Sequence, residues 1–269
     1  MARAPWAKWF LLPLPLAALF MGVYAVSGSA SDCVVTTGVL VGKLFTLVAF
    51  VLAATRFSWG DRLHAAWWLL AFNMTLLLAK DVFFGGRFFC PQVDIEADSE
   101  ATVRAVMVAA ANVASTVAML LLARAFRNAG LAAVASKPIH RLVKVGVVPI
   151  AFAIFIVTVR EQMAGVSADV LHTFLAVVIP NFADFVSFAV IGPLALTAFF
   201  LRGGSLAWPW ALLALGNAMW LFWDLATTMT HLSGVSVEVV RLLALGYTGS
   251  AGLEQWWALR VDPHLARVA

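Results

Sequence analysis

Long apolar runs dominate the chain and alternate with short polar segments. Each run has the roughly 17 to 25 residues that a helix needs to cross the hydrocarbon core of a bilayer. The pattern predicts an all-α, polytopic membrane helix bundle that forms a single integral membrane domain over residues 1–269. The eight predicted transmembrane helices are 9–27, 35–54, 64–84, 103–124, 140–159, 180–201, 207–229 and 237–259.

Basic residues gather in every second loop between these runs. Under the positive-inside rule such loops face the cytoplasm, which predicts that both termini are cytoplasmic. Most tryptophans, Trp67 and Trp68 among them, fall at the same predicted interface, where an amphipathic indole ring is favoured. The basic residues that set this topology are Arg3, Lys8, Arg56, Arg62, Arg124, Arg127, Lys137, Arg141, Lys144, Arg202, Arg260 and Arg267.

Composition agrees with a membrane protein and narrows the choice of partners. Of the 269 residues, 63% are hydrophobic and 12% are charged, whereas a soluble domain has about 25% charged residues. The net charge of +4 comes without a basic stripe that aromatic residues interrupt, so no nucleic-acid partner is expected. We expect the lipid bilayer as partner, with a membrane-protein partner or a homo-oligomer as further options.

The N-terminal segment, residues 1–30, has a basic start, an apolar centre and small residues near its end. It therefore resembles a cleavable secretory signal. We interpret it as a retained first membrane helix and keep cleavage as the alternative. The predicted location is the plasma (inner) membrane of a prokaryote, with multiple passes.

The two cysteines fall on one side of this topology. Cys33 precedes the second predicted helix and Cys90 follows the third, so both face the extracytoplasmic side, where disulfides persist. We predict a Cys33–Cys90 disulfide bond, with two separate thiols as the alternative.

The segment from Ser167 to Leu201 is too long for one simple crossing. Its roughly 34 helix-compatible residues would extend about 51 Å at 1.5 Å per residue. Pro180 lacks a backbone donor and disfavours helical geometry at Ile179. We therefore predict a short outer or re-entrant helix over 168–178, followed by a spanning helix that begins at 180.

The chain also suggests an internal repeat of four helices with parallel topology, with halves 1–130 and 131–269. One register of the third and seventh predicted helices aligns Asp81 with Asp224, and a register shifted by one residue aligns Asn73 with Asn217. Because apolar helices match easily by chance, unrelated halves remain the alternative.

Polar residues inside the apolar runs are the main candidates for function. Asn217, Asp224 and His231 recur every seven residues, which places them on one face of a helix. A carboxylate inside hydrocarbon is costly and is a functional hypothesis by default. We predict a polar cavity open to the extracytoplasmic side, with Asp184 and Asp224 as acids, Lys43 and Lys80 as their partners, and Asn73, Asn181 and Asn217 as neutral hydrogen-bonding groups.

A structural interpretation applies to the ionisable residues near helix ends. There, simple solvation or pairing between helices accounts for the charge, and long basic side chains extend to the interface. This interpretation is favoured for Lys80, Asp81, Glu100, Arg104, Glu238 and Arg241.

The histidines allow two haem sites to be drawn, His172 with His231 and His64 with His140. All four lie near a membrane surface, whereas haem ligands usually lie deeper on facing helices, so ordinary interfacial histidines are favoured and no cofactor is predicted. No zinc spacing, Walker loop, dinucleotide fingerprint or GxSxG motif occurs, which removes the common catalytic and metal-binding motifs.

Three functions fit these observations. The first is a small-solute or ion transporter or channel that uses the outward-facing cavity. The second is a non-catalytic sensor or a subunit of a larger membrane complex. The third, an intramembrane enzyme that acts on lipid or quinone with Asp224 and His231, is weakened because seven residues separate these side chains by about 10 Å along a helix. An enzyme is therefore not favoured.

Overall fold

The computed structural model describes residues 6–84, 98–128, 138–164, 174–200, 207–228 and 235–261. Within these ranges helices are joined by short turns and no strand occurs, so the predicted all-α fold is confirmed. The α-helices in these ranges are α1 (Trp6–Leu11), α2 (Pro13–Val26), α3 (Ser31–Ala54), α4 (Arg62–Ala79), α5 (Asp98–Asn128), α6 (Pro138–Ala164), α8 (Ile179–Phe200), α9 (Ala207–Thr228) and α10 (Val235–Val261). Three short turns accompany them: the 3₁₀ turn η1 (Gly28–Ala30) and the π-helical turns η2 (Lys80–Phe84) and η4 (Phe174–Val178).

Within the described ranges, six helical segments are long and apolar enough to cross a membrane. They are Trp9–Val26, Ser31–Ala54, Arg62–Phe83, Ala101–Ala125, Val145–Ala164 and Phe174–Ala195. Helices α9 and α10 have 22 and 27 residues but are not among these six. They carry polar residues such as Asn217, Asp224 and Glu254, which lower their hydropathy. The predicted count of eight crossings, and the cytoplasmic termini, stay predictions.

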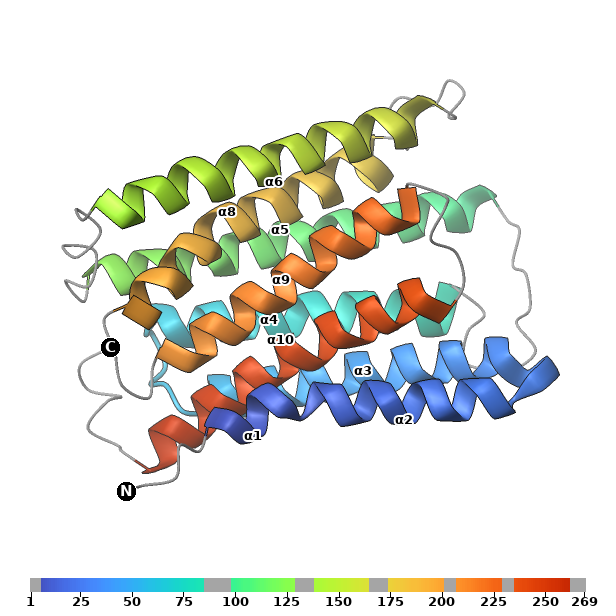
Figure 1. The fold of residues 1–269 in the computed structure, drawn as a ribbon, viewed down its shortest axis with the longest axis horizontal. Helices are drawn as coiled ribbons and strands as arrows, with labels where there is room; N and C mark the ends of the chain where they lie inside the picture. Colours follow the sequence, from blue (N-terminus) through green and yellow to red (C-terminus); the bar gives the residue numbers. More distant parts are fainter. Residues whose placement is uncertain are drawn as a thin grey trace.

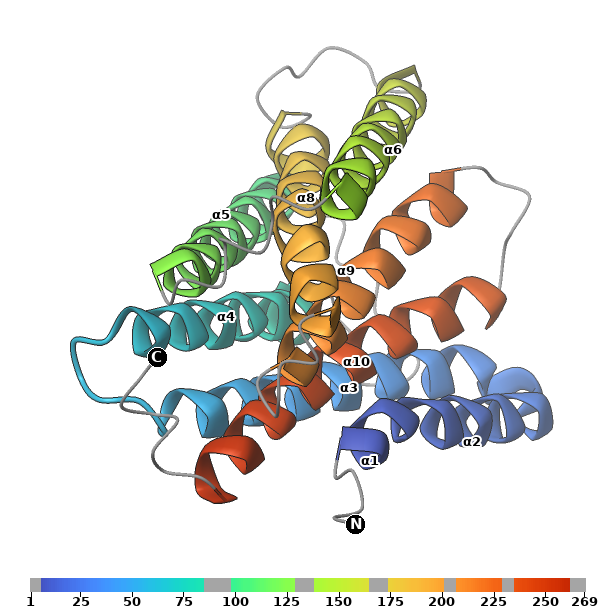
Figure 2. The same cartoon turned by 60° about the vertical axis from the view of Figure 1, so that its left-hand side comes forward.

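The helices form a bundle whose inner part is a ring. Helices α3, α4, α5, α8, α9 and α10 pack in this cyclic order, and α10 closes the ring against α3 (Figures 1 and 2). Helix α2 packs outside the ring on α10 and α3, whereas α6 packs on α8 and α9. Helix α1 begins, and α10 ends, at the same end of the bundle (Figure 1). The centre of the ring is thus lined by six helices.

Close packing of α3 against α10 depends on a glycine. A Cβ atom on Gly252 would lie 2.8 Å from the backbone carbonyl carbon and oxygen of Ala49, closer than real Cβ contacts. Only glycine lets the two backbones approach in this way, as small residues generally do in membrane helix pairs. The α3–α10 contact closes the ring and so fixes the positions of the side chains that point to its centre.

Helix α8 begins at Ile179, one residue before the predicted start at 180, but the predicted break before it is wrong. The chain runs without interruption from the π-helical turn η4 into α8, and the apolar span begins at Phe174 rather than at residue 180. Pro180 is the second residue of α8, a position near a helix start where its missing N–H is best tolerated. The wider π-helical turn before it absorbs the change in hydrogen bonding. Of the predicted outer helix 168–178, residues 168–173 lie outside the described ranges.

The apolar core occupies the half of the ring toward the α4 N-terminus. Phe50 packs on Trp67 with ring centroids 5.7 Å apart, and both side chains are buried, together with Leu70, Leu213 and other members of the cluster. Trp67 is only 1% exposed, so its ring fills the core instead of facing lipid headgroups, and its depth in the membrane stays a prediction. Its neighbour Trp68 is 42% exposed. On a helix, adjacent residues point about 100° apart, which separates the two tryptophans.

Candidate functional site

A buried cluster of three charges lies where α3 meets the end of α4. Lys43 Nζ lies 2.5 Å from one carboxylate oxygen of Asp81, and Lys80 Nζ lies 2.9 Å from the other. Asp81 is 1% exposed and Lys43 is 5% exposed. Lys43 Nζ also lies 3.5 Å from the backbone oxygen of Leu77. Such mutual pairing is how charge inside a low-dielectric interior is made tolerable.

This cluster agrees with one expectation and corrects another. Of the two structural interpretations of Asp81, solvation and pairing between helices, pairing is the one found: Asp81 is buried and binds both lysines. The lysines were expected to pair with Asp184 and Asp224, and within the described residues their carboxylate partner is Asp81 instead. The π-helical turn η2 contains Lys80 and Asp81, so the helix widens where Asp81 binds Lys43.

Asp184 and Asp224 form a separate pair of acids. Asp184 comes from α8 and Asp224 from α9; both line the same cavity, and their carboxyl groups are close enough to interact. A hydrogen bond between two carboxyl groups requires a proton on one of them, because an ionised carboxylate only accepts. Two carboxyl groups in this position can share a proton only while one of them is in its neutral form.

A chain of neutral hydrogen bonds supports this pair toward the α9 C-terminus. Asn181 Nδ2 donates to Gln162 Oε1 at 3.0 Å, and Gln162 Nε2 donates to Thr228 Oγ1 at 3.2 Å. The Thr228 hydroxyl in turn donates to the backbone oxygen of Asp224 at 2.8 Å. These bonds connect α6, α8 and α9 and fix the end of α9 next to the carboxyl pair.

The charged groups surround one cavity at the centre of the ring, with a volume of about 210 Å³. All six ring helices contribute to its wall, together with Lys80 of η2. Its ionisable lining residues are Lys43, Lys80, Asp184, Asp224 and Arg241, and its neutral polar lining residues include Asn73, Asn112, Ser115, Asn217 and Thr248. Most of the predicted site residues are therefore brought together by the fold.

The three predicted asparagines have different positions. Asn73 lines the cavity and donates to the backbone oxygen of Ala111 at 2.7 Å, which joins α4 to α5. Asn217 also lines the cavity and donates to the Leu213 oxygen of its own helix at 2.8 Å. Asn181 does not line it, and belongs to the supporting chain toward Gln162.

Arg241 lines the cavity, although the sequence interpretation favoured solvation or pairing between helices over a functional role. Its guanidinium lies 5.4 Å from the centre of the Trp223 ring, and its Nη1 lies 3.3 Å from a carboxylate oxygen of Glu238, one turn earlier on α10. Asn112, Ser115 and Thr248 were also missed. The spacing of Arg241, Thr248 and Gln255, seven residues apart like Asn217 and Asp224, was the signal that could have found the α10 face.

The cofactor and disulfide predictions fall largely outside the described residues. The His64 ring lies near Trp59 and Trp68, with Nδ1 3.2 Å from the backbone oxygen of Ala54. His172, His231 and the side chain of His140 are not described, so neither haem pair is tested. Cys33 lies in the first turn of α3, but Cys90 lies outside the described ranges, so the Cys33–Cys90 bond stays a prediction.

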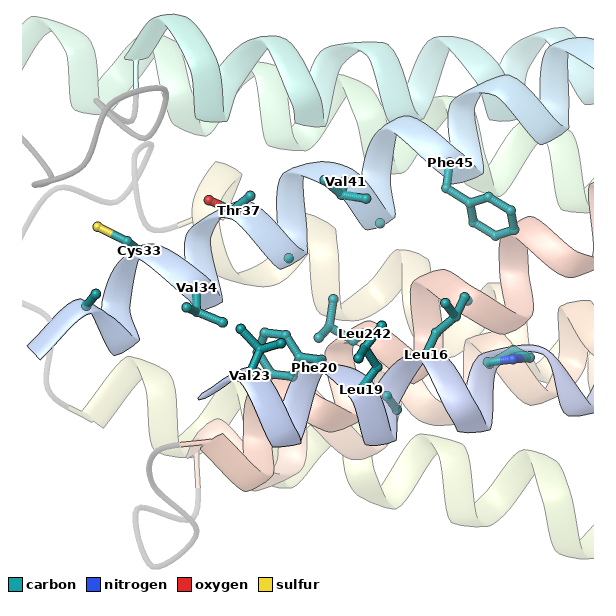
Figure 3. Close-up of a pocket in the computed structure, with 16 residues that line it drawn as sticks. Leu16, Leu19, Phe20, Val23, Cys33, Val34, Thr37, Val41, Phe45 and Leu242 are labelled. Carbon is teal, nitrogen blue, oxygen red and sulfur yellow. The ribbon is translucent and has the colours of Figure 1, made fainter. Parts of the chain in front are cut away.

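A second cavity, an apolar groove of about 550 Å³, lies between α2 and α3, and Leu242 and Gly246 of α10 form part of its wall. Figure 3 shows Leu16, Phe20 and Val23 of α2 facing the side chains of α3 across this groove. Its lining contains no charged side chain. The groove therefore lacks the countercharges of the central cavity and offers only apolar contact.

The fold and the central cavity define the protein as a helical membrane protein with a buried, ionisable site. Comparisons with protein families, with curated proteins and with solved structures give no match.

Proposed function

We propose that the protein is a transporter for a small solute or an ion, and that the cavity inside the ring is its binding site. The observation that carries the proposal is the position of this cavity: charged groups from α3, α8, α9 and α10 meet at the centre of a membrane bundle. Intramembrane ionisable groups that line a cavity are typical of substrate and ion pathways.

The size and charge of the cavity restrict the solute. A volume of about 210 Å³ is below the roughly 300 to 1,000 Å³ typical of pockets for drug-sized ligands. Lys43 and Lys80 share the single carboxylate of Asp81, and Arg241 pairs with Glu238, whereas the Asp184–Asp224 pair forms no ion pair among the described residues. The expected solute is small and polar. Its binding changes the protonation of the Asp184–Asp224 pair.

The Asp184–Asp224 pair offers a way to couple solute binding to proton binding. Loss of the shared proton leaves two adjacent carboxylates that repel each other in a low-dielectric site. A solute cation, or the cationic end of a zwitterion, relieves this repulsion and so competes with the proton. Solute binding and proton release are then linked at Asp184 and Asp224.

An internal repeat with halves 1–130 and 131–269 supports transport. The order α3, α4, α5 in one half corresponds to α8, α9, α10 in the other, and the contacts α3–α4, α4–α5 and α5–α8 have the counterparts α8–α9, α9–α10 and α10–α3. In this proposal a two-fold axis relates the halves, and it runs along the membrane normal through the centre of the ring. Transporters commonly place the substrate between two such repeats.

The pattern of buried side chains suggests which residues of the two halves correspond. Aligning Lys43 of α3 with Asp184 of α8 also aligns Thr46 with Ser187 and Phe50 with Ile191, and the last four side chains are at most 1% exposed. Aligning Asp81 with Asp224 pairs Leu70 with Leu213 and Met74 with Asn217, all buried as well. In this register the Lys43–Asp81 ion pair and the Asp184–Asp224 acid pair occupy equivalent places, one as a fixed structural pair and the other as an exchangeable one.

Full transport requires the membrane arrangement predicted from the sequence. Helices α9 and α10 cross the bilayer as the seventh and eighth spans, both termini lie in the cytoplasm, and the carboxyl pair lies toward the extracytoplasmic side of a prokaryotic plasma membrane. Solute then enters from outside, and the apolar core below the cavity forms the closed inner side.

A non-catalytic sensor or complex subunit is the second candidate. It is favoured by the floor of the cavity, where Phe50, Leu70 and Met119 belong to the buried apolar core and offer no polar route onward. A sensor binds solute without moving it. The enzyme hypothesis has less support, because the described residue beside Asp224 is a second acid, Asp184.

Proteoliposomes test the proposal. Vesicles loaded with the pH-sensitive dye pyranine are exposed in turn to amino acids, small carboxylates and monovalent cations. A solute that moves the internal pH identifies the substrate, and Asp224→Asn should abolish that signal. The matched control is Asp32→Asn, the same chemical change at an exposed position in the first turn of α3. Solute binding by calorimetry with no flux would favour the sensor.

A further inference from the structure

Two arginines share one tryptophan at the end of the bundle where α3 and α10 finish. The guanidinium carbon of Arg56 lies 5.1 Å from the centre of the Trp256 ring, and that of Arg260 lies 5.4 Å from the same point. Their charges are thus at most about 10.5 Å apart. The indole ring holds both cations through its negative face.

These two positive charges lack a carboxylate partner within the described residues. Arg56 Nε is buried from solvent and has no hydrogen-bond acceptor there. The nearest acid along α10 is Glu254, two residues before Trp256, and a separation of two residues places it about 200° around the helix, on the opposite side. Glu254 is 2% exposed and forms no ion pair in the described structure, so it does not neutralise the arginines.

The site lies at a membrane boundary. The apolar span of α3 ends at Ala54, two residues before Arg56. Trp59 is 92% exposed and Trp257 is 37% exposed at the same end. Exposed tryptophans beside arginines are typical of the headgroup level of a bilayer.

We propose that Arg56 and Arg260 bind the phosphate of an anionic phospholipid headgroup. Guanidinium groups match phosphate oxygens in charge and in hydrogen-bonding geometry. The unpartnered Nε of Arg56 provides a buried donor, and the exposed tryptophans provide contact with the acyl chains near the headgroup. The predicted cytoplasmic position of this end agrees, because anionic lipids attract basic residues at that surface. The site is separate from the central cavity and does not depend on transport.

Native mass spectrometry of the full chain tests the lipid site. The protein in a neutral detergent is titrated with phosphatidylglycerol and with phosphatidylcholine of the same acyl chains. We expect a saturable phosphatidylglycerol adduct that the choline lipid does not form. The double variant R56Q/R260Q should bind phosphatidylglycerol about 30-fold more weakly, the effect expected for the loss of two charges near an anionic surface. R56K/R260K should recover part of the binding, because it restores charge but not the planar fork.

The matched control is Arg62→Gln, which removes an exposed arginine at the first residue of α4 without touching Trp256. Its adduct should equal that of the wild type. Circular dichroism and gel filtration establish that each variant is folded. Equal adducts with both lipids, an equal loss in R62Q, or displacement of the lipid by millimolar inorganic phosphate would each overturn the proposal.

Discussion

Lys43 and Asp81 form a buried ion pair that joins α3 to the π-helical end of α4, with 2.5 Å between Nζ and the carboxylate oxygen. Lys80 binds the other oxygen of the same carboxylate from the more exposed side. The pair closes one wall of the central cavity and fixes two neighbouring ring helices against each other. This pair joins a cation to an acid, whereas the pair of Asp184 and Asp224 consists of two acids.

Breaking the Lys43–Asp81 pair should destabilise the protein more than removing it. Lys43→Met leaves Asp81 with Lys80 alone, and Asp81→Leu leaves Lys43 buried without a countercharge, at a cost of about 3 to 5 kcal/mol. The double variant K43M/D81L should recover most of this loss. Unfolding by a denaturing detergent, followed by circular dichroism, measures the difference, and losses in the double variant that equal the sum of the single losses would contradict it.

Replacing Gly252 should loosen the ring. In Gly252→Ala the new Cβ would meet the backbone of Ala49 at 2.8 Å, and backbone cannot move aside cheaply. We expect a loss of about 1 to 3 kcal/mol, typical of overpacking. Gly146→Ala in α6 is the control, because nothing lies within 4 Å of its Cβ position and helix propensity favours alanine. Equal thermal stability of the two variants would show that α3 and α10 are not in close contact.

The fold was predictable from the sequence to the extent that it depends on local hydrophobicity. Runs of apolar residues located each helical segment, because membrane crossing fixes their length. What failed was local detail. Pro180 was expected to break a helix, but a π-helical turn accommodates it, and π-helical turns have no simple sequence signature. Trp67 was expected to face lipid headgroups, because depth alone does not show which side of a helix faces the core.

The candidate site was predictable in its residues but not in its pairings. Lys43, Asp184 and Asp224 were identified as candidates because they lie far from the ends of their apolar runs, and all three line the cavity. Which acid meets which lysine depends on which helices are neighbours, and the sequence does not give the order of helices in a ring. Asp81 and Arg241 lie near helix ends, where the sequence allows both solvation and pairing between helices; only the packing of the helices shows that Asp81 pairs with Lys43 and that Arg241 lines the cavity.

The proposed repeat predicts that Asp184→Lys will fold. In the register that equates Lys43 with Asp184, a lysine at 184 faces Asp224 as Lys43 faces Asp81. The variant should therefore form a second ion pair and retain thermal stability near that of the wild type, while losing any proton-coupled flux. Asp184→Leu is the comparison, because it leaves Asp224 without a partner. If the lysine variant unfolds at lower temperature than the leucine variant, the register is wrong.

The Cys33–Cys90 bond should be present in protein from an oxidising compartment. Labelling with a maleimide under denaturing conditions should modify neither cysteine before reduction and both after it, and mass spectrometry counts the labels. Cys33→Ser should expose the Cys90 thiol to label without reduction. Because the bond closes a long loop in the unfolded chain, its loss should cost about 2 to 5 kcal/mol of stability. Labelling of both cysteines before reduction would show two separate thiols.

Membrane topology decides whether α9 and α10 complete the path. If both cross the bilayer, cysteines introduced singly into 129–137 and 201–206 should be cytoplasmic, and those in 165–173 and 229–234 should be extracytoplasmic. A membrane-impermeant maleimide applied to intact cells of a variant without Cys33 and Cys90 should label only the second group. Lysis should expose the first group as a positive control. Labelling of the 201–206 and 229–234 positions from the same side would mean that α9 does not span, and Asp224 could then not serve a transmembrane pathway.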